Sequence, residues 1–261
     1  MSQPEAVPLD IDEIQSNLKT RRIGRKLFVY KSTSSTNDVA RRYIDDKNND
    51  GLAVFAEEQT AGRGRTGNKW FSKRSDSILC SLILIDNNLS AELLSLTCAV
   101  AVADAIGKPA KIKWPNDIII NSKKVAGILL EAISNRPSNT YIIGIGINCH
   151  QNKDSFPDEL SSKATSIDIE NKTRCDRTGL AKRLLCSMDY WLEIAEKNNK
   201  KIIDSWRKLS IQLGQRVTLL FNKKHFSGNC IGIDPEKGII LQLDSGGVRM
   251  FDAAHTTIIK K

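Results

Sequence analysis

The sequence predicts an α+β protein: a mixed, largely antiparallel sheet with flanking helices, followed by a small C-terminal all-β barrel. Three apolar, β-rich runs at residues 118–120, 125–133 and 141–147 follow one another at hairpin spacing, which is typical of antiparallel strands. Residues 90–106 and 180–195 carry helical patterns. The last fifty residues are short β-rich pieces separated by turn residues, which is typical of a small barrel or sandwich.

The composition bounds the class of protein. Of 261 residues, 40% are hydrophobic and 26% are charged, which excludes disordered, collagen-like and disulfide-scaffold proteins. No apolar run approaches the ~18 residues that cross a bilayer, and residues 1–10 lack the pattern of a secretory signal. The six cysteines form no C-x-x-C pair, so we expect reduced thiols in a cytoplasmic protein without a membrane partner.

The charge balance points to anionic partners. Lys and Arg number 39 against 30 Asp and Glu, a formal net charge of +9. This excess permits nucleotides, nucleic acid or acidic proteins as partners, without choosing among them. The three histidines lie far apart and lack ligand spacing, so the sequence predicts no fixed metal site in the protein.

The elements of the first half follow from apolar spacing. A helix begins at Ser35, because short polar side chains can bind the free backbone N–H groups of a first turn. Its apolar positions continue at helical spacing: Val39, Ala40, Tyr43 and Ile44. Strands are expected at residues 27–30, 52–56 and 78–85.

The second half is predicted in the same way. Ser90 begins the helix that runs to residue 106, which is mostly apolar and therefore well covered. Residues 111–114 form a strand ahead of the three hairpin strands, and residues 202–209 form a helix after that of 180–195. The final short strands are expected at 216–221, 226–233, 238–243, 248–251 and 256–259.

We divide the chain at residues 26 and 210. Residues 1–26 are polar, weakly patterned and end in a basic cluster, so a solvated arm is expected. A nucleic-acid-binding arm would need a helix-turn-helix, which so few residues cannot build. Residues 27–210 form the main domain, and residues 211–261 form the small β-barrel.

One motif is misleading. Gly62-Arg63-Gly64-Arg65-Thr66-Gly67 follows a predicted strand and matches the G-x-G-x-x-G of dinucleotide-binding proteins. That fingerprint needs a helix at its third glycine, whose N-terminus holds the pyrophosphate. Residues 68–77 contain two apolar residues and no helical period, so we exclude a dinucleotide-binding fold. No P-loop sequence is present either.

A basic, glycine-rich loop remains, at residues 59–69, which we call the Gly/Arg loop. Its glycines let the backbone approach a ligand, and its cations are Arg63, Arg65 and Lys69. Two interpretations fit these residue types equally. The loop either folds over an anionic ligand or stays solvated and mobile.

Other segments carry ligand-binding chemistry. Hydroxyls and amides stand at one helix start and just before the loop, at Ser35, Thr36, Asn37 and Gln59. Lys113-Trp114-Pro115-Asn116-Asp117 places a cation, an aromatic ring and a carboxylate within five residues. Lys124 begins an otherwise buried strand, and the glycines before Asn148 leave a strand face where a flat ligand could lie. Taken singly, each of these residues has a structural explanation as a cap, a turn, a core or a hairpin residue.

Together, these segments resemble the biotin protein ligase family, over most of the chain from about residue 27. The most specific pieces are the loop motif followed by Lys69-Trp70, the run from Lys113 to Asp117, and Lys124-Val125-Ala126-Gly127-Ile128-Leu129. The resemblance implies a catalytic domain like that of class II synthetases and a reaction in two steps. The biotin carboxylate attacks the α-phosphate of ATP, giving biotinyl-5′-AMP and pyrophosphate. The ε-amine of a lysine on a biotin carboxyl carrier protein then attacks this anhydride and releases AMP.

The resemblance also implies roles for individual residues. Lys124 and Arg65 are expected to be catalytic. The expected biotin-binding residues are Ser35, Thr36, Asn37, Gln59, Arg63, Gly64, Arg65, Lys124 and Gly127. The expected nucleotide- and phosphate-binding residues are Lys113, Asp117, Asn148 and Trp70. Mg²⁺ would arrive with ATP and lie near Asp117.

The residue chemistry agrees with these roles. The ureido ring of biotin offers a carbonyl and two N–H groups on an apolar body, so its site needs both donors and acceptors. A carboxylate and a triphosphate repel each other, so joining them requires cations. A lipoate ligase is the nearest rival, although lipoate lacks the ureido ring. A basic nucleic-acid-binding module is the rival of another class, and it has only 6% aromatic residues to stack on bases.

Some members of the family carry an N-terminal helix-turn-helix and repress biotin genes. Only about 25 residues precede the first strand here, so we predict no DNA partner. The positive charge is then assigned to ATP, the adenylate and an acidic carrier, such as a domain of acetyl-CoA carboxylase. An exposed sheet edge could pair two subunits, which leaves a homodimer open.

Overall fold

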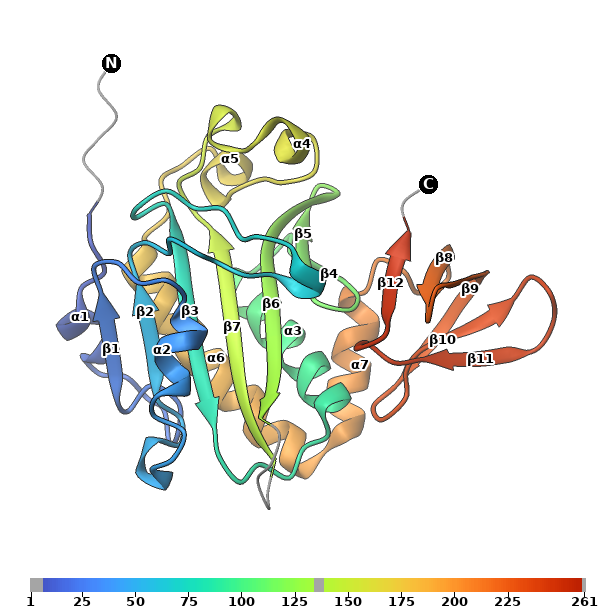
Figure 1. Ribbon diagram of the computed structural model, residues 1–261, viewed down its shortest axis with the longest axis horizontal. Coiled ribbons are helices and arrows are strands. Elements are labelled where there is room, and N and C mark those ends of the chain that lie inside the picture. Colours follow the sequence, from blue (N-terminus) through green and yellow to red (C-terminus); the bar gives the residue numbers. More distant parts are fainter. Residues whose placement is uncertain (1–6, 134–138, 260–261) are drawn as a thin grey trace.

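The computed structural model describes residues 7–133 and 139–259, which form two β-sheets and a set of helices (Figure 1). The larger sheet has seven strands in the order β1-β2-β3-β7-β6-β5-β4. β1 and β2 pair in parallel and every other neighbouring pair is antiparallel, which confirms the predicted mixed sheet. The strands are β1 Leu27–Tyr30, β2 Ala53–Ala56, β3 Ser77–Leu84, β4 Lys111–Lys113, β5 Asp117–Ile120, β6 Lys123–Ile133 and β7 Thr140–Asn148.

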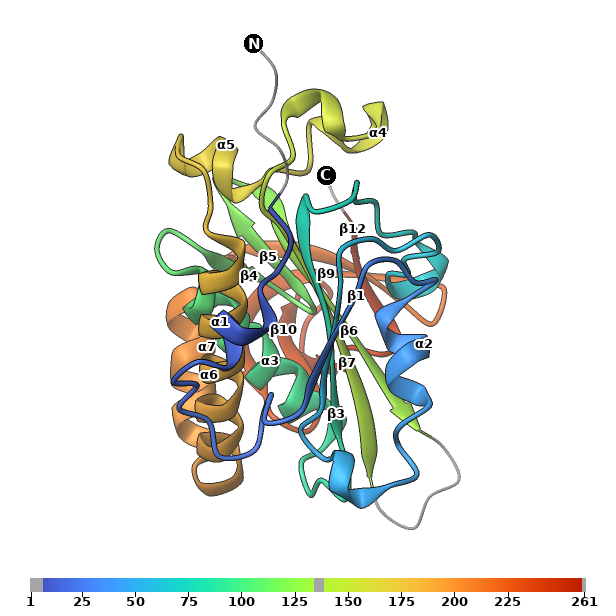
Figure 2. The ribbon, with the colours of Figure 1, turned by 90° about the vertical axis from the view of Figure 1, so that its left-hand side faces the viewer.

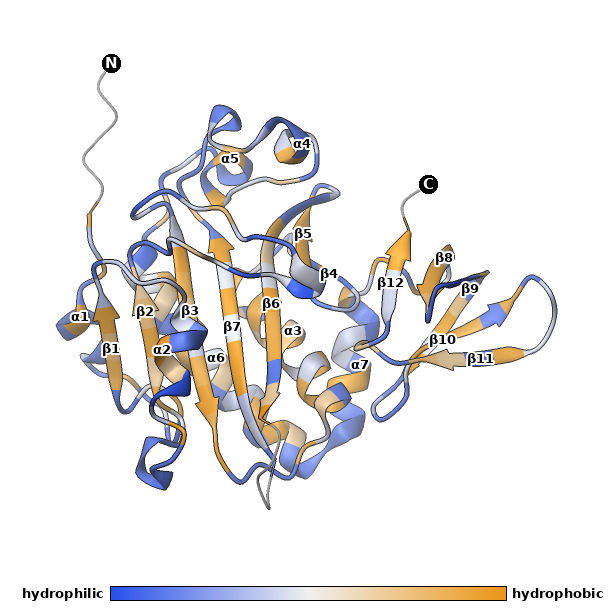
Figure 3. Cartoon of the chain, viewed as in Figure 1, coloured by the Kyte–Doolittle hydropathy of each residue, from blue (hydrophilic) through white to orange (hydrophobic). Residues whose placement is uncertain are grey.

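Helices cover both faces of this sheet (Figure 2). α3 (Ala91–Ile106), α6 (Arg177–Lys197) and α7 (Asn199–Leu209) lie on one face, and α2 (Thr36–Arg41) lies on the other. All eight residues of β3 are therefore buried, in place of the alternation that a one-sided sheet would show. The hydropathy colouring shows the same property as nearly continuous apolar runs along the central strands (Figure 3). Ser90 caps α3 as predicted, with its Oγ accepting from Leu93 N at 3.2 Å.

The C-terminal unit is an antiparallel sheet of five strands in the order β11-β10-β9-β8-β12. This confirms the predicted all-β unit, although within the described residues the end strands β11 and β12 do not pair to close the ladder. Phe221, Phe226 and Phe251 pack together inside it, and the Arg249 guanidinium lies 4.5–5.3 Å from their ring centres. The strands are β8 Arg216–Phe221, β9 Lys224–Asp234, β10 Gly238–Leu243, β11 Val248–Phe251 and β12 Thr256–Ile259.

The expectation of a solvated arm before residue 27 is wrong for residues 7–26. This segment contains the short helix α1 (Ile11–Gln15) and buries Leu9, Ile14 and Ile23. The carboxylate of Asp189 on α6 accepts three successive backbone N–H groups, those of residues 21, 22 and 23, at 2.8–2.9 Å. The buried residues follow no regular period, so the sequence carried no signal for this packing. Residues 1–6 of the expected arm lie outside the described residues.

Other elements depart from expectation for local reasons. The helix that begins after Ser35 ends at Arg41 rather than continuing to residue 44. α4 (Asp158–Ser161) and α5 (Ile167–Asn171) were not predicted, because four or five residues are too few to show a helical period. In the part of the chain that the structure describes, no helix has the length and apolar character to cross a membrane. The division of the chain at residues 26 and 210 stays a prediction.

A buried ion pair joins four segments of the main sheet unit. The Arg177 guanidinium, at the start of α6, lies 2.9 Å from Glu57 Oε2 just after β2, and both side chains are less than 5% exposed. Arg177 also donates to the carbonyls of Ser77 and Val7, at 3.0–3.2 Å. Glu57 accepts from Leu9 N at 2.6 Å and from Ser75 Oγ at 2.7 Å. The pair is therefore fully hydrogen-bonded, which is the condition under which a buried charge is tolerated.

We predict that Arg177→Met lowers the free energy of unfolding by about 3–5 kcal/mol, because Glu57 is then left buried and charged without its cation. Adding Glu57→Gln removes that stranded charge, so the double variant should be more stable than Arg177→Met alone. Urea unfolding followed by circular dichroism measures both. A double variant less stable than the single one would contradict this account.

Thiol reactivity should separate the buried from the half-buried cysteines, all six of which are free. Burial raises the pKa of Cys98 to about 12 and that of Cys230 to about 11. A hydrogen bond from Cys149 instead lowers the pKa of the half-buried Cys175. Because the thiolate is the reactive form, iodoacetamide at pH 8 should label Cys175 and Cys186 first. Peptide mass spectrometry after timed labelling tests this, with the urea-unfolded chain as control; early labelling of Cys98 in the native protein would refute it.

Candidate active site

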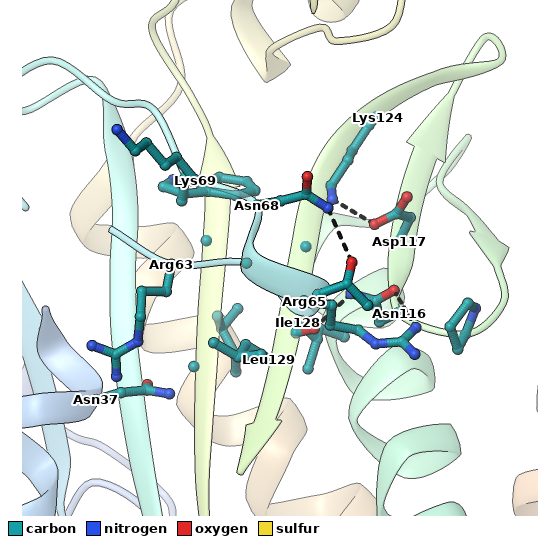
Figure 4. A pocket seen from close by; sticks show the side chains of 18 of the residues that line it. Asn37, Arg63, Arg65, Asn68, Lys69, Asn116, Asp117, Lys124, Ile128 and Leu129 are labelled. Atoms are coloured by element: carbon teal, nitrogen blue, oxygen red, sulfur yellow. Dashed lines mark hydrogen bonds and ion pairs between the residues drawn. The ribbon is translucent and has the colours of Figure 1, made fainter. Parts of the chain in front are cut away.

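The predicted site residues converge on one pocket, on the sheet face beside α2 (Figure 4). The Gly/Arg loop forms one wall, β3, β6 and β7 form the floor, and residues 257–258 of β12 close the far side. Every predicted site residue except Asn148 lines it. These residues are Ser35, Thr36, Asn37, Gln59, Arg63, Gly64, Arg65, Trp70, Lys113, Asp117, Lys124 and Gly127.

A hydrogen-bonded polar cluster forms the wall next to α2. Gln59 Oε1 accepts from Thr36 N at 2.7 Å and from Thr36 Oγ1 at 2.9 Å. Gln59 therefore caps α2, whereas Ser35, the residue expected to do so, makes no side-chain cap bond. Ser81 Oγ lies 2.7 Å from Thr36 Oγ1 and 2.5 Å from Asn37 Oδ1. Within the described residues Asn37 Nδ2 has no partner, so an amide donor is left over at this wall.

The glycine-rich floor is covered by protein side chains. We expected the strand face before Asn148 to be open for a flat ligand, but the Trp70 ring lies on Gly146 and Asn37 lies on Gly144. A Cβ added at Gly146 would stand 2.5 Å from Trp70 Cε2, and one at Gly144 would stand 2.6 Å from Asn37 Oδ1. The glycines are therefore needed because the Trp70 ring and the Asn37 side chain occupy the space above them, so they do not form an open surface for a ligand.

Lys124 and Asp117 form an ion pair at the start of β6. Lys124 Nζ lies 2.5 Å from Asp117 Oδ1, and it also lies 5.7 Å from the centre of the Trp70 ring. The side chains are 35% and 25% exposed, so the ammonium group is accessible to a ligand from the pocket. A Cβ on Gly127 would meet Lys124 Cε at 2.9 Å, which explains a glycine at that position too. The structure thus places a cation and a carboxylate in contact on an aromatic surface.

The two arginines of the Gly/Arg loop point to opposite sides. Arg65 donates to the carbonyls of Ala253 and Thr256 in the C-terminal unit, and its Nη1 lies 3.3 Å from Asn116 Oδ1. Burial lowers the pKa of Arg65. Arg63 instead reaches Asp38 of α2 at 2.8 Å, and the resulting hydrogen bond is the main reason why the pKa of Asp38 is lowered.

A second groove continues from the first pocket, between the loop and α4. Both cavities are lined by Asn68, Lys69, Trp70, Lys113, Asp117 and Lys124. Asn148, absent from the first pocket, lines this groove together with Phe156, Leu160 and Lys163. Asn148 Nδ2 donates to the carbonyl of Thr165 at 2.9 Å, which ties the end of β7 to the segment after α4. No group of three or more His, Cys, Asp or Glu side chains arranged to hold a metal ion occurs among residues 7–133 and 139–259.

Comparison with known proteins decides the family. The model of the biotin/lipoate A/B protein ligase family matches residues 29–148. The bifunctional ligase/repressor BirA of Bacillus spizizenii is 34% identical over 253 residues, which cover 94% of this chain and 78% of that protein. The chain belongs to this family, among its biotin protein ligases. The biotin–[acetyl-CoA-carboxylase] ligase of Mycobacterium tuberculosis is 32% identical over 264 residues, which cover 97% of this ligase and 93% of that protein.

The fold of this ligase agrees with the same assignment. A structure of the biotin protein ligase from Aquifex aeolicus in complex with biotin and ATP superposes with a TM-score of 0.79 at 26% identity. The match covers 91% of this ligase and all of that chain, so it includes both sheet units.

Several residues of the pocket and its surroundings were missed by sequence reasoning. Ser81 lies in a strand that reads as pure core, and Asp38 and Glu131 are ordinary surface carboxylates in the sequence. Thr257 and Ile258 reach the pocket from the C-terminal unit, for which we predicted no site residue. Asp38 could have been noticed because it directly follows Ser35-Thr36-Asn37; the other residues carry no local signal.

We predict that Gly146→Ala displaces the Trp70 ring, because the added Cβ would overlap it. The other three tryptophans are at most 9% exposed, so a red shift of tryptophan fluorescence would report Trp70. Gly232→Ala is the matched control, since its nearest contact would be an ordinary 3.6 Å. Unchanged emission in Gly146→Ala, with native circular dichroism, would contradict the packing described above.

Proposed function

We propose that this ligase joins biotin to a lysine of a carrier protein in two steps, through biotinyl-5′-AMP. In the first step the biotin carboxylate oxygen attacks the α-phosphorus of ATP, and pyrophosphate leaves. In the second step the lysine amine attacks the acyl carbon, an amide forms, and AMP leaves with the bonding electrons. The names of the relatives support the activity, and the Aquifex aeolicus complex with biotin and ATP supports these two substrates.

The observation that carries the proposal is the position of Lys124. It lines both the pocket of polar side chains and the adjoining groove, so its ammonium group stands where two ligands would meet. The two reacting groups are anions, and a fixed cation between them lowers their repulsion as they approach. Asp117 holds Lys124 at 2.5 Å and so limits the positions that the ammonium group can take.

The pocket beside α2 has the chemistry that biotin requires. Gln59, Thr36 and Ser35 offer hydroxyl and amide groups to a ureido ring, and Asn37 has an amide N–H without a partner among the described residues. Leu79, Ile128, Leu129 and Ile145 supply apolar walls for the fused rings and the chain. We assign biotin to this pocket, with its carboxylate directed to Lys124.

The groove beside α4 suits the nucleotide. Lys69, Lys113 and Lys163 bring positive charge for phosphates, and Phe156 and Leu160 offer apolar surface for a base. Asp117 adds a carboxylate oxygen, which fits Mg²⁺ carried by ATP because this ion is usually held by one or two carboxylates together with substrate phosphates. When bound, Mg²⁺ would neutralise phosphate charge in the first step.

The wider setting of the reaction follows from the same assignment. We assign the basic surface to ATP, the adenylate and an acidic carrier protein rather than to DNA. A cytoplasmic location agrees with six free thiols. A homodimer would pair along the edge at β1, because the edge at β4 is already bridged by Ser210 and Ile211.

The activity is tested by incubating the ligase with biotin, ATP and Mg²⁺ and measuring pyrophosphate. Biotin-dependent pyrophosphate, and retention of biotinyl-AMP on the protein, are expected. Lipoate, which lacks the ureido ring, should compete poorly with biotin. Equal turnover of lipoate would reassign the substrate, and the absence of biotin-dependent pyrophosphate would exclude the reaction.

We predict that Lys124→Met slows formation of biotinyl-AMP by about 10²–10³-fold, the cost of losing one preorganised charge contact in a transition state. Its unfolding midpoint should change little, because Lys124 is one-third exposed. Lys123→Met removes the neighbouring cation and should keep near-normal activity. A loss below about tenfold in Lys124→Met would exclude Lys124 from the reacting centre.

A further inference from the structure

The side chain of Arg63 is held by two carboxylates from two different elements. Its Nη1 donates to Asp38 Oδ2 of α2 at 2.9 Å, and its Nη2 lies 2.8 Å from Asp38 Oδ1. The same Nη2 lies 3.4 Å from Glu131 Oε1 of β6. Glu131 is in turn held by Arg41, at the end of α2, at 2.9 Å. The guanidinium therefore binds Asp38 through both Nη atoms and also contacts Glu131.

The tip of the Gly/Arg loop, residues 62–69, makes few other hydrogen bonds or ion pairs to the rest of the described protein. Its backbone hydrogen bonds at Gly64, Asn68 and Trp70 close on residues within 62–70 and do not reach the rest of the protein. Residues 66–69 are exposed. Beyond the packing of Trp70, the tip is held by Arg65 on the side of the C-terminal unit and by Arg63 on the side of α2. Loss of the Arg63 contacts would free one side of the tip.

We propose that Asp38 and Glu131 are positioning residues that hold the Gly/Arg loop closed over the adenylate by binding Arg63. This rests on the proposed function and deepens it. The family resemblance assigned Arg63 to biotin binding. Here its guanidinium binds two carboxylates of the protein and so retains the intermediate indirectly, by holding the loop in place. Arg63 and Asp38 are 41% and 37% exposed, and exposed ion pairs are individually weak. A weak contact suits a loop that must open each time substrates enter and products leave.

Release of biotinyl-AMP from the loaded ligase tests the proposal through a mutant cycle. Arg63→Met removes the cation, and the Asp38→Asn, Glu131→Gln double variant removes both carboxylates. Each should speed release by about fivefold, the scale of an exposed ion-pair network. The triple variant should release the adenylate no faster than the double variant, because Arg63 then has no carboxylate left to act through. Arg42→Met removes an exposed cation that directly follows α2 and has no hydrogen bond or ion pair with the loop in the described part of the chain, so it is the control and should release at the wild-type rate.

The outcomes separate an indirect role from a direct one. If Arg63→Met speeds release of biotinyl-AMP further in the Asp38→Asn, Glu131→Gln background, Arg63 contacts the ligand itself and the proposal is overturned. Unchanged release in the Asp38→Asn, Glu131→Gln variant overturns it as well. Hydrogen exchange of amides 62–69 in the ligand-free protein provides a second measurement, which should be faster in all three variants. This readout judges the loop contact even if the ligase makes no biotinyl-AMP, and unchanged exchange would reject the contact on its own.

Discussion

The geometry of the site depends on the buried ion pair between Glu57 and Arg177. Glu57 is the residue at which the chain leaves β2 towards the Gly/Arg loop, and its carbonyl accepts from Ser75 N at 2.9 Å where the chain returns. Its carboxylate binds the Ser75 hydroxyl and the guanidinium of Arg177. The two ends of the segment that contains the loop, Glu57 and Ser75, are thus held together by hydrogen bonds. Gln59, two residues after Glu57, is thereby positioned to cap α2. Every charge in this contact is hydrogen-bonded, so its burial yields rigidity without a stranded charge.

From this anchor the loop spans three parts of the protein. Arg63 contacts α2 and β6, and Arg65 reaches carbonyls of the C-terminal unit. Trp70, which directly follows the loop, covers Gly127 and Gly146 on the floor of the pocket. The C-terminal unit is therefore a wall of the pocket. The connection between the units is reinforced by Gln212, whose side chain bonds the backbone N–H and carbonyl of Trp114 at 3.1 and 3.3 Å.

The chemistry follows from electrostatics rather than from a nucleophile on the enzyme. The attacking group in each step comes from a substrate, a carboxylate in the first and an amine in the second. In the proposed mechanism the protein supplies a cation where the two ligands meet, with a polar pocket on one side and a basic groove on the other. A loop that covers this centre also excludes water from an anhydride that would otherwise hydrolyse.

Much of this protein could be predicted from its sequence, because the decisive signals are local. The cap at Ser90, the hairpin spacing of the strands from residue 117 to residue 148, and the short pieces after residue 215 depend on neighbours in the chain, and all appear in the structure. The absence of a helix after Gly67 was equally readable, since a helix needs a period over many residues. The order of the motifs along the chain was enough to indicate the family.

Only the tertiary structure decided which distant groups meet. Leu9 and Ile23 are buried although their segment looks polar, Gln59 replaces Ser35 as the cap of α2, and Trp70 fills the space above Gly146. Ser81, Asp38 and Glu131 likewise gain their roles only from partners between 25 and 68 residues away. A side chain's type states which bonds it can make, but its partner is set by how the sheet brings remote segments together. The sequence therefore determined the elements and the chemistry on offer, and folding determined the contacts that turn them into a site.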